Sequence, residues 1–392
     1  MDLHLTEEQT AFRQEVRDFL DKELPSDWIG GPISFAHVDQ GTEMKWRKML
    51  AEKGWNTMGW PKEYGGQGAS PMTQLIFNEE WNYRGAPGLD TFGLELLGPT
   101  LMVHGTEEQK RAYLGDIARG EVVWCQGFSE PGSGSDLASL QTRAVEDGDD
   151  YVINGQKIWS SYAQYADHMF LLARTDPDAV KHRGITFFLM DMNAPGITVR
   201  PIQEMSGESS FNEEFFDNVR VPKQNVLGEV NRGWYVAMTL LDFERTGINH
   251  PAGGRRILDL LVNYANETTV NGKTLAADPR VRHKLADVAV ALETSRMLAY
   301  RIAWMQGEGL VPNMEASILR LLSTQTSQLL ARVGMEVMGL KGQLEQGSKY
   351  AELQGFISNQ YLFSVPYTIE SGSQEIQRNV VATRGLGLPR GA

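Results

Sequence analysis

Cysteine is almost absent from this 392-residue chain, whose only cysteine is Cys125. A single cysteine cannot close an intrachain disulfide or build a cysteine-rich metal site, and its rarity is typical of a reducing compartment. The seven histidines are scattered without the spacing of a metal-binding motif. We therefore expect a cytoplasmic protein with no metal site.

Long apolar runs are also missing. No stretch of about 18 apolar residues, the length needed to cross a bilayer, occurs in the sequence. The first residues, MDLHLTEEQTAFRQEVRDFL, lack the basic and apolar regions of a signal peptide. Positive charge is scarce as well, because 37 Lys and Arg face 50 Asp and Glu and give a net charge of −13. We expect no membrane insertion and no nucleic-acid partner, whose phosphates would be repelled.

The motifs of several common enzyme classes are absent. The sequence contains no G-x-G-x-x-G, no P-loop, no H-E-x-x-H and no G-x-S-x-G. The nearest approach to the first, residues 132–137, lacks the third glycine and does not lie in a β-α-β pattern. These absences argue against a dinucleotide fold, a P-loop NTPase, a zinc peptidase and an α/β-hydrolase.

The pattern of apolar residues divides the chain into three parts. Thr6-x-x-Gln9 and Thr106-x-x-Gln109 resemble capping boxes at the starts of helices, so residues 1–120 read as helical. Short β-type runs then occupy residues 121–230, with Asp147-Gly148 and Asn154-Gly155 favouring tight hairpin turns between them. In residues 231–392 the helical period returns, and apolar residues from Val281 to Ile302 alternate spacings of four and three, which predicts a long helix in a bundle.

Four motifs follow one another along this framework. They are SEPGSGSD at 129–136, NGQKIWSS at 154–161, LLDFERTGI at 240–248 and ESGSQEIQRN at 370–379. The Gly- and Ser-rich segment after Trp124 suits either a surface turn or a loop whose backbone closely approaches a ligand. The four motifs in this order resemble the acyl-CoA dehydrogenase family of flavoproteins over essentially the whole chain. They are most similar to large subunits of bacterial heteromeric enzymes that act on pimeloyl-CoA or on steroid-side-chain thioesters.

This resemblance implies the family's architecture and its cofactor, FAD. The architecture is mainly α with a β domain: an N-terminal helical domain (1–120), a middle β-barrel (121–230) and a C-terminal four-helix bundle (231–392). It also implies α,β-dehydrogenation of an acyl-CoA, with electrons passed to an electron-transferring flavoprotein. Positions that match cofactor-binding residues of the family are Gln126, Phe128, Ser129, Trp159, Ser160, Ser161, Gly339, Gly342, Ser373 and Glu375. In the family, Trp159 would lie against the flavin face and Ser161 would bond flavin N5.

The resemblance also places the acyl-CoA and the catalytic base. Substrate contacts are implied for Ser135, Asp242, Arg245, Glu370 and Ser371. Many relatives carry the catalytic glutamate where this chain has Ser371, and a serine without a partner cannot act as this base. Other relatives place it in an ER sequence, which here supplies Glu244, so Glu244 is the predicted base and Glu370 is the alternative. A backbone N–H of Ser371 or Glu370 would bond the thioester oxygen.

The assembly predicted from the resemblance departs from that of homotetrameric relatives. Their C-terminal domain provides an Arg-x-x-Phe-Gly motif that reaches a neighbour's FAD, whereas this chain has YANETTVNGKTL there. A second acyl-CoA dehydrogenase-like subunit would then complete a heterotetramer. The alternative is a homo-oligomer that uses Lys273, Arg280 or Arg282. Two further functions stay open, an acyl-CoA oxidase or related flavin oxidase and a structural subunit that completes a partner's flavin site.

Overall fold

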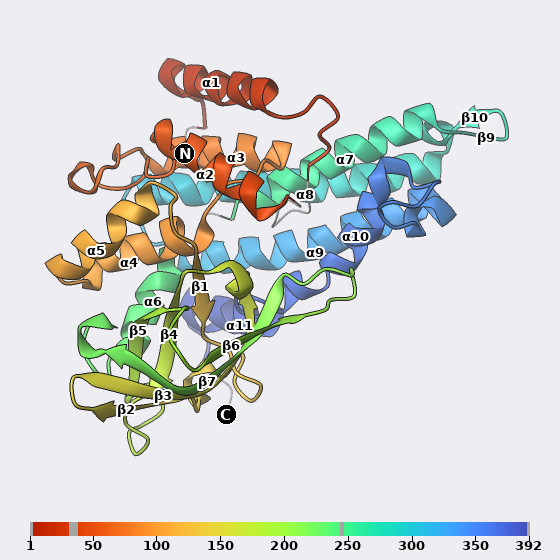
Figure 1. Cartoon of the computed structure of the whole chain (residues 1–392). Coiled ribbons are helices and arrows are strands. Elements are labelled where there is room, and N and C mark those ends of the chain that lie inside the picture. Colours follow the sequence, from red (N-terminus) through yellow and green to blue (C-terminus); the bar gives the residue numbers. More distant parts are fainter. Residues whose placement is uncertain (1–2, 31–37, 244–246, 390–392) are drawn as a thin grey trace. The chain divides into compact units, whose positions relative to one another are not determined.

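The computed structural model describes residues 3–30, 38–243 and 247–389, with the side chains of 242 and 243 left out (Figure 1). The chain forms two compact units by its internal contacts. Met1–Val38, Ala69–Pro87 and Thr246–Ala392 make up the first, and Asp39–Gly68 and Gly88–Arg245 the second. We call them the helical unit and the β unit. The domain boundaries after residues 120 and 230 stay a prediction.

The β unit is built on one eight-stranded sheet of mainly antiparallel strands. Its order is β6-β7-β3-β2-β4-β5-β8, and β1 pairs with β4 in parallel. The strands are β1 (Trp124–Gly127), β2 (Arg143–Asp147), β3 (Asp150–Ser161), β4 (His168–Arg174), β5 (Ile185–Asp191), β6 (Ile197–Ile202), β7 (Phe211–Pro222) and β8 (Val226–Leu227). The β-type runs predicted from the sequence are therefore present as strands.

Only one of the two predicted hairpin turns is formed. β2 and β3 are joined at Gly148, whose φ of 63° suits a tight turn, and Asp147 pairs with Asp150. The turn predicted at Asn154-Gly155 is wrong, because β3 continues through both residues with a register shift against β7. The Asn154 side chain accepts from the backbone N–H of Asn218 on β7 instead of closing a turn. The dipeptide thus makes a β-bulge that bends a long strand.

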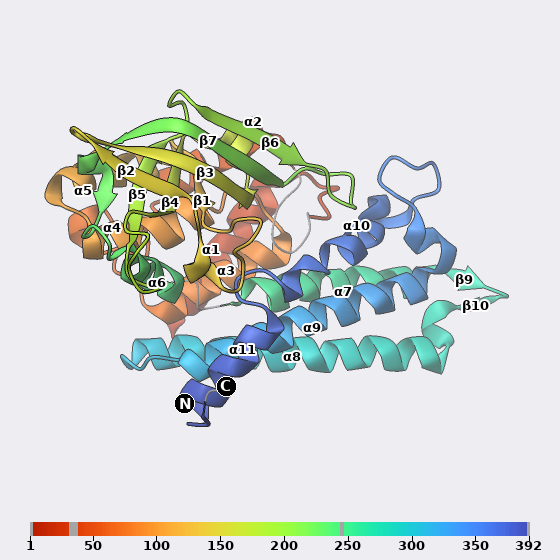
Figure 2. The same ribbon diagram turned by 90° about the horizontal axis from the view of Figure 1, so that it is seen from below.

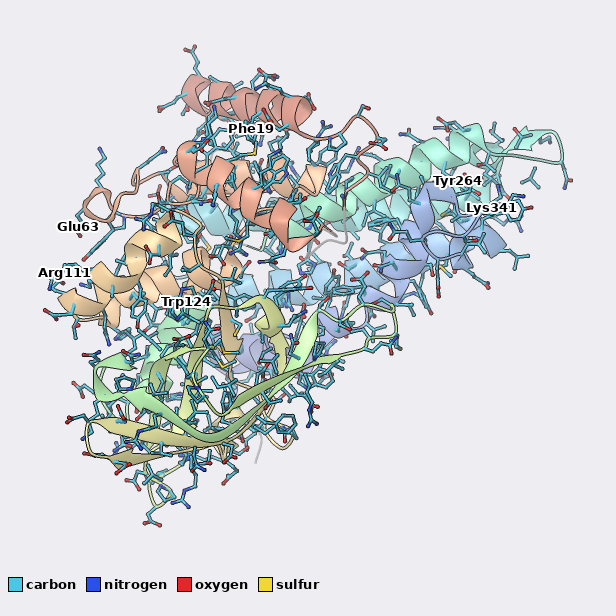
Figure 3. The ribbon with its side chains drawn as sticks, in the orientation of Figure 1. Phe19, Glu63, Arg111, Trp124, Tyr264 and Lys341 are labelled. Carbon is cyan, nitrogen blue, oxygen red and sulfur yellow. The ribbon has the colours of Figure 1, made fainter. Side chains whose placement is uncertain are left out.

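Helices cover the apolar side chains of this sheet. Trp124 of β1, labelled in Figure 3, is buried in a core with Phe128, Phe170, Phe187 and Leu240. The helices of the β unit are α2 (Gln40–Glu52), the π-helical Thr91–Leu97, α4 (Gly98–His104), α5 (Glu107–Ala118) and α6 (Gly233–Phe243). The capping box predicted at Thr106 and Gln109 is present at the start of α5.

The helical unit contains three long helices, α7, α8 and α9, which lie side by side in Figure 2. Its helices are α1 (Glu7–Glu23), α3 (Pro71–Arg84), α7 (Asn249–Glu267), α8 (Pro279–Gly307), α9 (Asn313–Met338), α10 (Phe356–Phe363) and α11 (Gln374–Val380). The long helix predicted from Val281 to Ile302 is α8, and the predicted capping box of Thr6 and Gln9 starts α1. Across residues 3–30, 38–243 and 247–389, no helix combines the length and apolar character needed to cross a bilayer.

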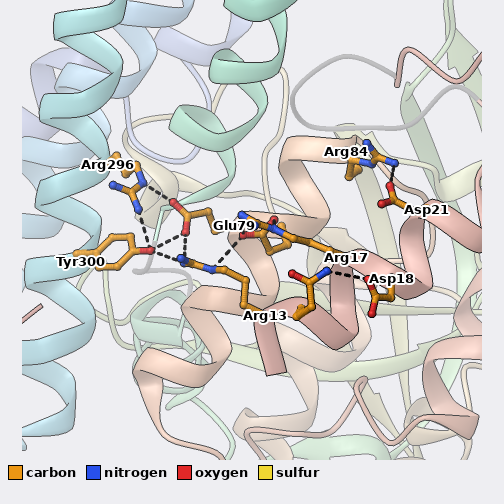
Figure 4. A network of polar contacts seen from close by, with 10 residues as sticks. Arg13, Arg17, Asp18, Asp21, Glu79, Arg84, Arg296 and Tyr300 are labelled. Atoms are coloured by element: carbon orange, nitrogen blue, oxygen red, sulfur yellow. Dashed lines mark hydrogen bonds and ion pairs between the residues drawn. The ribbon is translucent and has the colours of Figure 1, made fainter. Parts of the chain in front are cut away.

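A buried polar network joins α1, α3 and α8 (Figure 4). Glu79 of α3 is 8% exposed and accepts hydrogen bonds from Arg13, Arg296 and Tyr300. Because its carboxylate is paired with two guanidinium groups and one phenol, its burial is compensated. The network fixes where α1 lies on the helices of its own unit.

Candidate flavin and thioester sites

Two of the four motifs meet in the β unit. The N–H of Ile158 donates to the carbonyl oxygen of Ser129 over 3.0 Å. This bond places the end of β3, which carries Trp159, Ser160 and Ser161, beside the segment that follows β1. The structure thus brings together residues about thirty positions apart in the sequence.

Trp159 has the geometry of a residue that covers a flat ligand. Trp159 is 57% exposed although its neighbour Ser160 is buried, and its ring lies edge-on to the ring of Phe211, with 6.2 Å between the ring centroids. Its φ of 68° is left-handed, a backbone conformation that a bulky residue rarely adopts. This twist at the bulge turns the indole out of the strand's regular alternation.

Three polar side chains on β1, on the segment that follows it and at the end of β3 have no partner within the described residues. They are the amide of Gln126 and the hydroxyls of Ser129 and Ser161, all half-buried. Phe128, by contrast, packs its ring edge-on against Phe170 and Phe187 in the core. A heteroaromatic ring lying on Trp159 could therefore receive polar contacts from Gln126, Ser129 and Ser161, while Phe128 could offer only backbone groups.

Ser160 points the opposite way. Its hydroxyl donates to Glu214 over 2.7 Å, and its carbonyl oxygen accepts from the Asn212 side chain. Ser160 and Glu214 are both buried. Burial raises the pKa of Glu214 to about 7, although the bond from Ser160 and the charge of Lys157 oppose that shift. The Ser160 hydroxyl is therefore already engaged inside the sheet, and the predicted contact of Ser160 to the cofactor stays a prediction.

A fully buried lysine supports the segment that follows β1. Lys157 is 0% exposed and donates to the Phe128 carbonyl oxygen at 2.9 Å and to Glu130 at 2.8 Å. Burial lowers the pKa of Lys157 to about 8, against the attraction of Glu130. Lys157 and Glu130 lie within two of the motifs, but the sequence predicted no role for either. Strand alternation was the missed signal, since Lys157 and Glu214 occupy inward positions of β3 and β7.

The Gly- and Ser-rich segment forms a turn held at Glu130. Glu130 and Ser133 exchange two backbone hydrogen bonds, and the Glu130 carboxylate also accepts the N–H groups of Gln141 and Thr142. A side chain at Gly132 or Gly134 would meet no other atom within 4 Å, and Ser135 beside them is exposed. The turn therefore presents an open, unobstructed backbone to a ligand.

The last motif lies in the helical unit. Ser373 caps α11 by accepting from the N–H of Ile376, and Glu375 is exposed in the first turn of that helix. Ser371, just before the cap, has a φ of 50° and a carbonyl oxygen that accepts from Gln377. The carboxylate of Glu370 lies 3.6 Å from the guanidinium of Arg320.

Two glycines predicted to bind the cofactor lie at the C-terminal end of α9 and just beyond it. Gly339 ends this helix with a φ of 58°, and Gly342 is buried in the short helix that follows. Gln325, which bonds Gln374 of the last motif, precedes Gly339 by nearly four turns, or ~20 Å at 1.5 Å per residue. Lys341 and Tyr264 mark this end of the helical unit in Figure 3. The glycines and the 370–375 segment would thus contact different parts of an extended ligand, or different molecules.

The remaining predicted residues cannot be placed. Glu244 and Arg245 lie outside the described residues, and Asp242 is described only by its backbone at the end of α6. Their predicted roles as base and as substrate contacts stay predictions.

Comparison with protein families covers nearly the whole chain. Residues 6–121 match the profile "Acyl-CoA dehydrogenase, N-terminal domain", residues 125–219 match the middle domain and residues 231–386 match the C-terminal domain. The chain belongs to the acyl-CoA dehydrogenase family. The predicted family and fold class are thus confirmed, and the protein is an oxidoreductase that acts on acyl-CoA.

Individual relatives of this acyl-CoA dehydrogenase agree with that assignment. It is 38% identical over 389 residues to acyl-CoA dehydrogenase IpdE1 of Mycobacterium tuberculosis, covering 97% of this chain and 98% of that protein. The structure described as "Tcur3481-Tcur3483 steroid ACAD" matches it with a TM-score of 0.90 and 35% identity, covering 100% of both chains. The ChsE4-ChsE5 complex from Mycobacterium tuberculosis matches with a TM-score of 0.88, 35% identity and the same coverage.

Acyl-CoA dehydrogenases are flavin-dependent and generally use FAD. The indole of Trp159 with the unpartnered polar groups of Gln126, Ser129 and Ser161 fits such a ring system, since it combines a flat apolar contact with hydrogen-bonding groups. In this acyl-CoA dehydrogenase, these described residues could hold the ring system of a flavin.

Proposed function

We propose that this chain uses FAD to convert an acyl-CoA thioester to its trans-2-enoyl-CoA and passes the electrons to an electron-transferring flavoprotein. The observation that carries this proposal is the exposed indole of Trp159 near the end of β3, with the hydroxyls of Ser129 and Ser161 unpaired among the described residues, in a chain that matches the family over all three of its profiles. A bound FAD would supply the acceptor for the β-hydride.

The residues of the chain would do the rest of the chemistry. Glu244 would take the α proton of the thioester. A backbone N–H near Ser371 would hold the thioester oxygen as negative charge develops on it, because the α proton is only weakly acidic. Trp159 would cover one face of the flavin and exclude water there, and Ser161 would bond a ring nitrogen.

The base is tested by comparing two isosteric variants. In an anaerobic stopped-flow assay, we expect Glu244→Gln to retain flavin but to lose about 10⁴-fold or more in flavin reduction, since removing a member of a catalytic unit has that scale of effect. Glu370→Gln is the matched comparison and should keep most of the rate. Normal reduction by Glu244→Gln with loss of rate in Glu370→Gln would transfer the role to Glu370.

The electron acceptor requires a separate measurement. We expect steady turnover with an electron-transferring flavoprotein and little hydrogen peroxide in air. Rapid peroxide formation at the same substrate concentration would identify an oxidase instead. A panel of acyl-CoA thioesters that includes steroid side chains is the appropriate substrate set, because a structural relative is described as a steroid enzyme.

We also propose a heteromeric assembly. The segment that takes the place of the family's FAD-binding arginine forms the end of α7 and a small hairpin of β9 (Thr269–Val270) and β10 (Lys273–Thr274). Arg280 is one of the residues that could replace the missing arginine in a homo-oligomer. Its side chain is held by the carboxylate of Asp278 through three hydrogen bonds. Two of the structural relatives are described as pairs of different proteins. We expect FAD saturation only after co-expression with a second dehydrogenase-like subunit, and full flavin content of the chain alone would contradict this.

A further inference from the structure

The backbone at Ser371 has a conformation that needs outside support. Ser371 and Gly372 have φ values of 50° and 85°, two successive left-handed residues that reverse the chain before α11. A left-handed serine costs about 1 kcal/mol or more, so neighbouring groups must hold it in place. Gln377 contributes by donating from its side-chain amide to the carbonyl oxygens of both residues.

Arg320 holds the other side of the same turn. From α9 it donates through Nη2 to the carbonyl oxygen of Glu370 at 3.0 Å and to that of Tyr367 at 3.3 Å. The same nitrogen lies 3.6 Å from the Glu370 carboxylate. A guanidinium is rigid and always charged, so it fixes both carbonyl groups more firmly than a flexible lysine could.

This contact sets the direction of one N–H group. The carbonyl of Glu370 and the N–H of Ser371 belong to one peptide group, and in a planar trans peptide they point in opposite directions. Since Arg320 holds that carbonyl, the Ser371 N–H points away from α9. It has no acceptor among the described residues, whereas the N–H of Glu370 already donates to Pro366 at 3.0 Å. Of the two backbone donors considered from the sequence, the Ser371 N–H is the one available.

His250 in turn holds Arg320. This histidine of α7 is 4% exposed, and its Nε2 lies 3.2 Å from Nη1 of Arg320. Burial, with the Arg320 charge adding to it, lowers the pKa of His250 to about 3, so the ring is neutral and accepts the bond. The ring of Tyr367 lies edge-on to His250 at 5.0 Å. Arg320 is thereby held through both terminal nitrogens of its guanidinium, Nη1 and Nη2.

We propose that Arg320 is a positioning residue, which aims the Ser371 N–H at the thioester oxygen and strengthens it as a donor. This role rests on the proposed function. The Arg320 charge on the Glu370 carbonyl polarises the peptide group, and a polarised peptide donates a stronger hydrogen bond through its N–H. Arg320 itself does not touch the thioester. Arg320 acts on the substrate through the peptide group between Glu370 and Ser371, whose N–H stabilises the negative charge that develops on the thioester oxygen.

The test uses the flavin-loaded protein, with its partner subunit if one is needed for flavin binding. In Arg320→Met, we expect flavin reduction to slow by about 100-fold, the scale of effect of a misaligned reacting group. A second readout is independent of turnover. A bound 3-oxoacyl-CoA has an acidic α proton and forms an enolate that absorbs in the near ultraviolet. Its ionisation in Arg320→Met should require a pH higher by about one unit, a tenfold weaker stabilisation.

Three further variants separate this role from a general loss of structure. Arg332→Met removes an exposed arginine from the same helix and should leave the rate and the ionisation unchanged. Arg320→Lys keeps the positive charge but loses the planar guanidinium. It should recover part of the rate of flavin reduction and part of the ionisation of the probe. Arg320→Gln, which also keeps a donor, serves if Arg320→Met does not fold. Wild-type rates and ionisation in the folded Arg320 variants would overturn the role of Arg320. Wild-type protein that neither reduces its flavin nor ionises the probe would overturn the proposed function itself.

Discussion

The hydroxyl group of Ser160 donates a hydrogen bond of 2.7 Å to Oε2 of Glu214 in the interior of the β unit. Glu214 is 0% exposed, and its other oxygen, Oε1, is buried with no hydrogen-bond partner among the residues that the structure describes. A carboxylate in this setting is poorly solvated, which is why burial raises the pKa of Glu214 to about 7. The strand that presents Trp159 outward is therefore anchored inward by a group that titrates near neutrality.

This titration makes stability depend on pH. Between the ordinary pKa of a glutamate and about 7, the unfolded chain loses the proton while the folded chain keeps it, so stability falls as the pH rises through this window. Glu214→Gln cannot ionise. As the pH rises from 5 to 8, we expect the free energy of unfolding of the variant to increase by about 3 kcal/mol relative to that of wild type, as measured by urea unfolding. Glu213→Gln, on the half-buried neighbour, is the control, and a wild-type pH profile in Glu214→Gln would contradict the assignment.

Lys157→Met tests the support that this buried lysine gives to residues 128–130, the segment that follows β1. The variant leaves the Glu130 carboxylate without its buried cation and the Phe128 carbonyl without its donor. We expect a loss of about 3–5 kcal/mol in unfolding free energy, together with faster flavin release. Adding Glu130→Gln should restore part of the stability, because the uncompensated charge is then gone. Lys223→Met removes an exposed ion pair with Glu146 and should change stability by less than about 1 kcal/mol.

The elements that local chemistry specifies were the ones predicted correctly. Both capping boxes start helices, and the seam from Val281 to Ile302 is α8. The turn at Asn154-Gly155 failed because its dipeptide suits either a hairpin or a bulge. Pairing with β7, sixty positions away, decides between them, and a single sequence does not reveal that pairing.

The residues of the candidate site also divide into those that a local motif reveals and those that only the fold reveals. Trp159, Ser129 and Ser161 could be selected by their motifs, since such motifs need particular residues at fixed spacing. Lys157 and Glu214 were missed because charged residues are presumed exposed, and only the fold shows that both point into the sheet. Arg320 lies fifty positions from the carbonyl of Glu370 that it holds. Its role depends on how α9 packs against the last motif, which no local pattern encodes.

Trp159→Ala removes the flat contact proposed for the flavin. The indole is already 57% exposed, so we expect little change in unfolding of the flavin-free protein. The Kd for FAD should rise by about 10- to 100-fold, in proportion to the lost apolar contact. Tyr165→Ala, which removes another half-exposed ring of the β unit, is the control. Equal FAD retention in both variants, measured by equilibrium dialysis, would place the flavin elsewhere.

The Glu79 network makes a prediction about stability alone (Figure 4). Arg13 donates to both Glu79 and the Tyr300 hydroxyl at 2.7 Å, and Arg296 contacts the same two groups. Glu79→Gln leaves these two guanidinium groups without their shared buried anion, so we expect a loss of about 3 kcal/mol in unfolding free energy. Tyr300→Phe removes a neutral partner and should cost about 1–2 kcal/mol.

A second carboxylate on the same arginine provides the control. Glu293 contacts Arg296 from the surface of α8 with its side chain 55% exposed, so Glu293→Gln should change stability by less than about 0.5 kcal/mol. Hydrogen exchange should show faster opening of α1 in Glu79→Gln than in Glu293→Gln, because the network holds that helix on α3 and α8. Equal exchange of α1 in the two variants would mean that apolar packing and the contacts of Arg13 and Arg17 to Glu80, rather than Glu79, fix α1 in the helical unit.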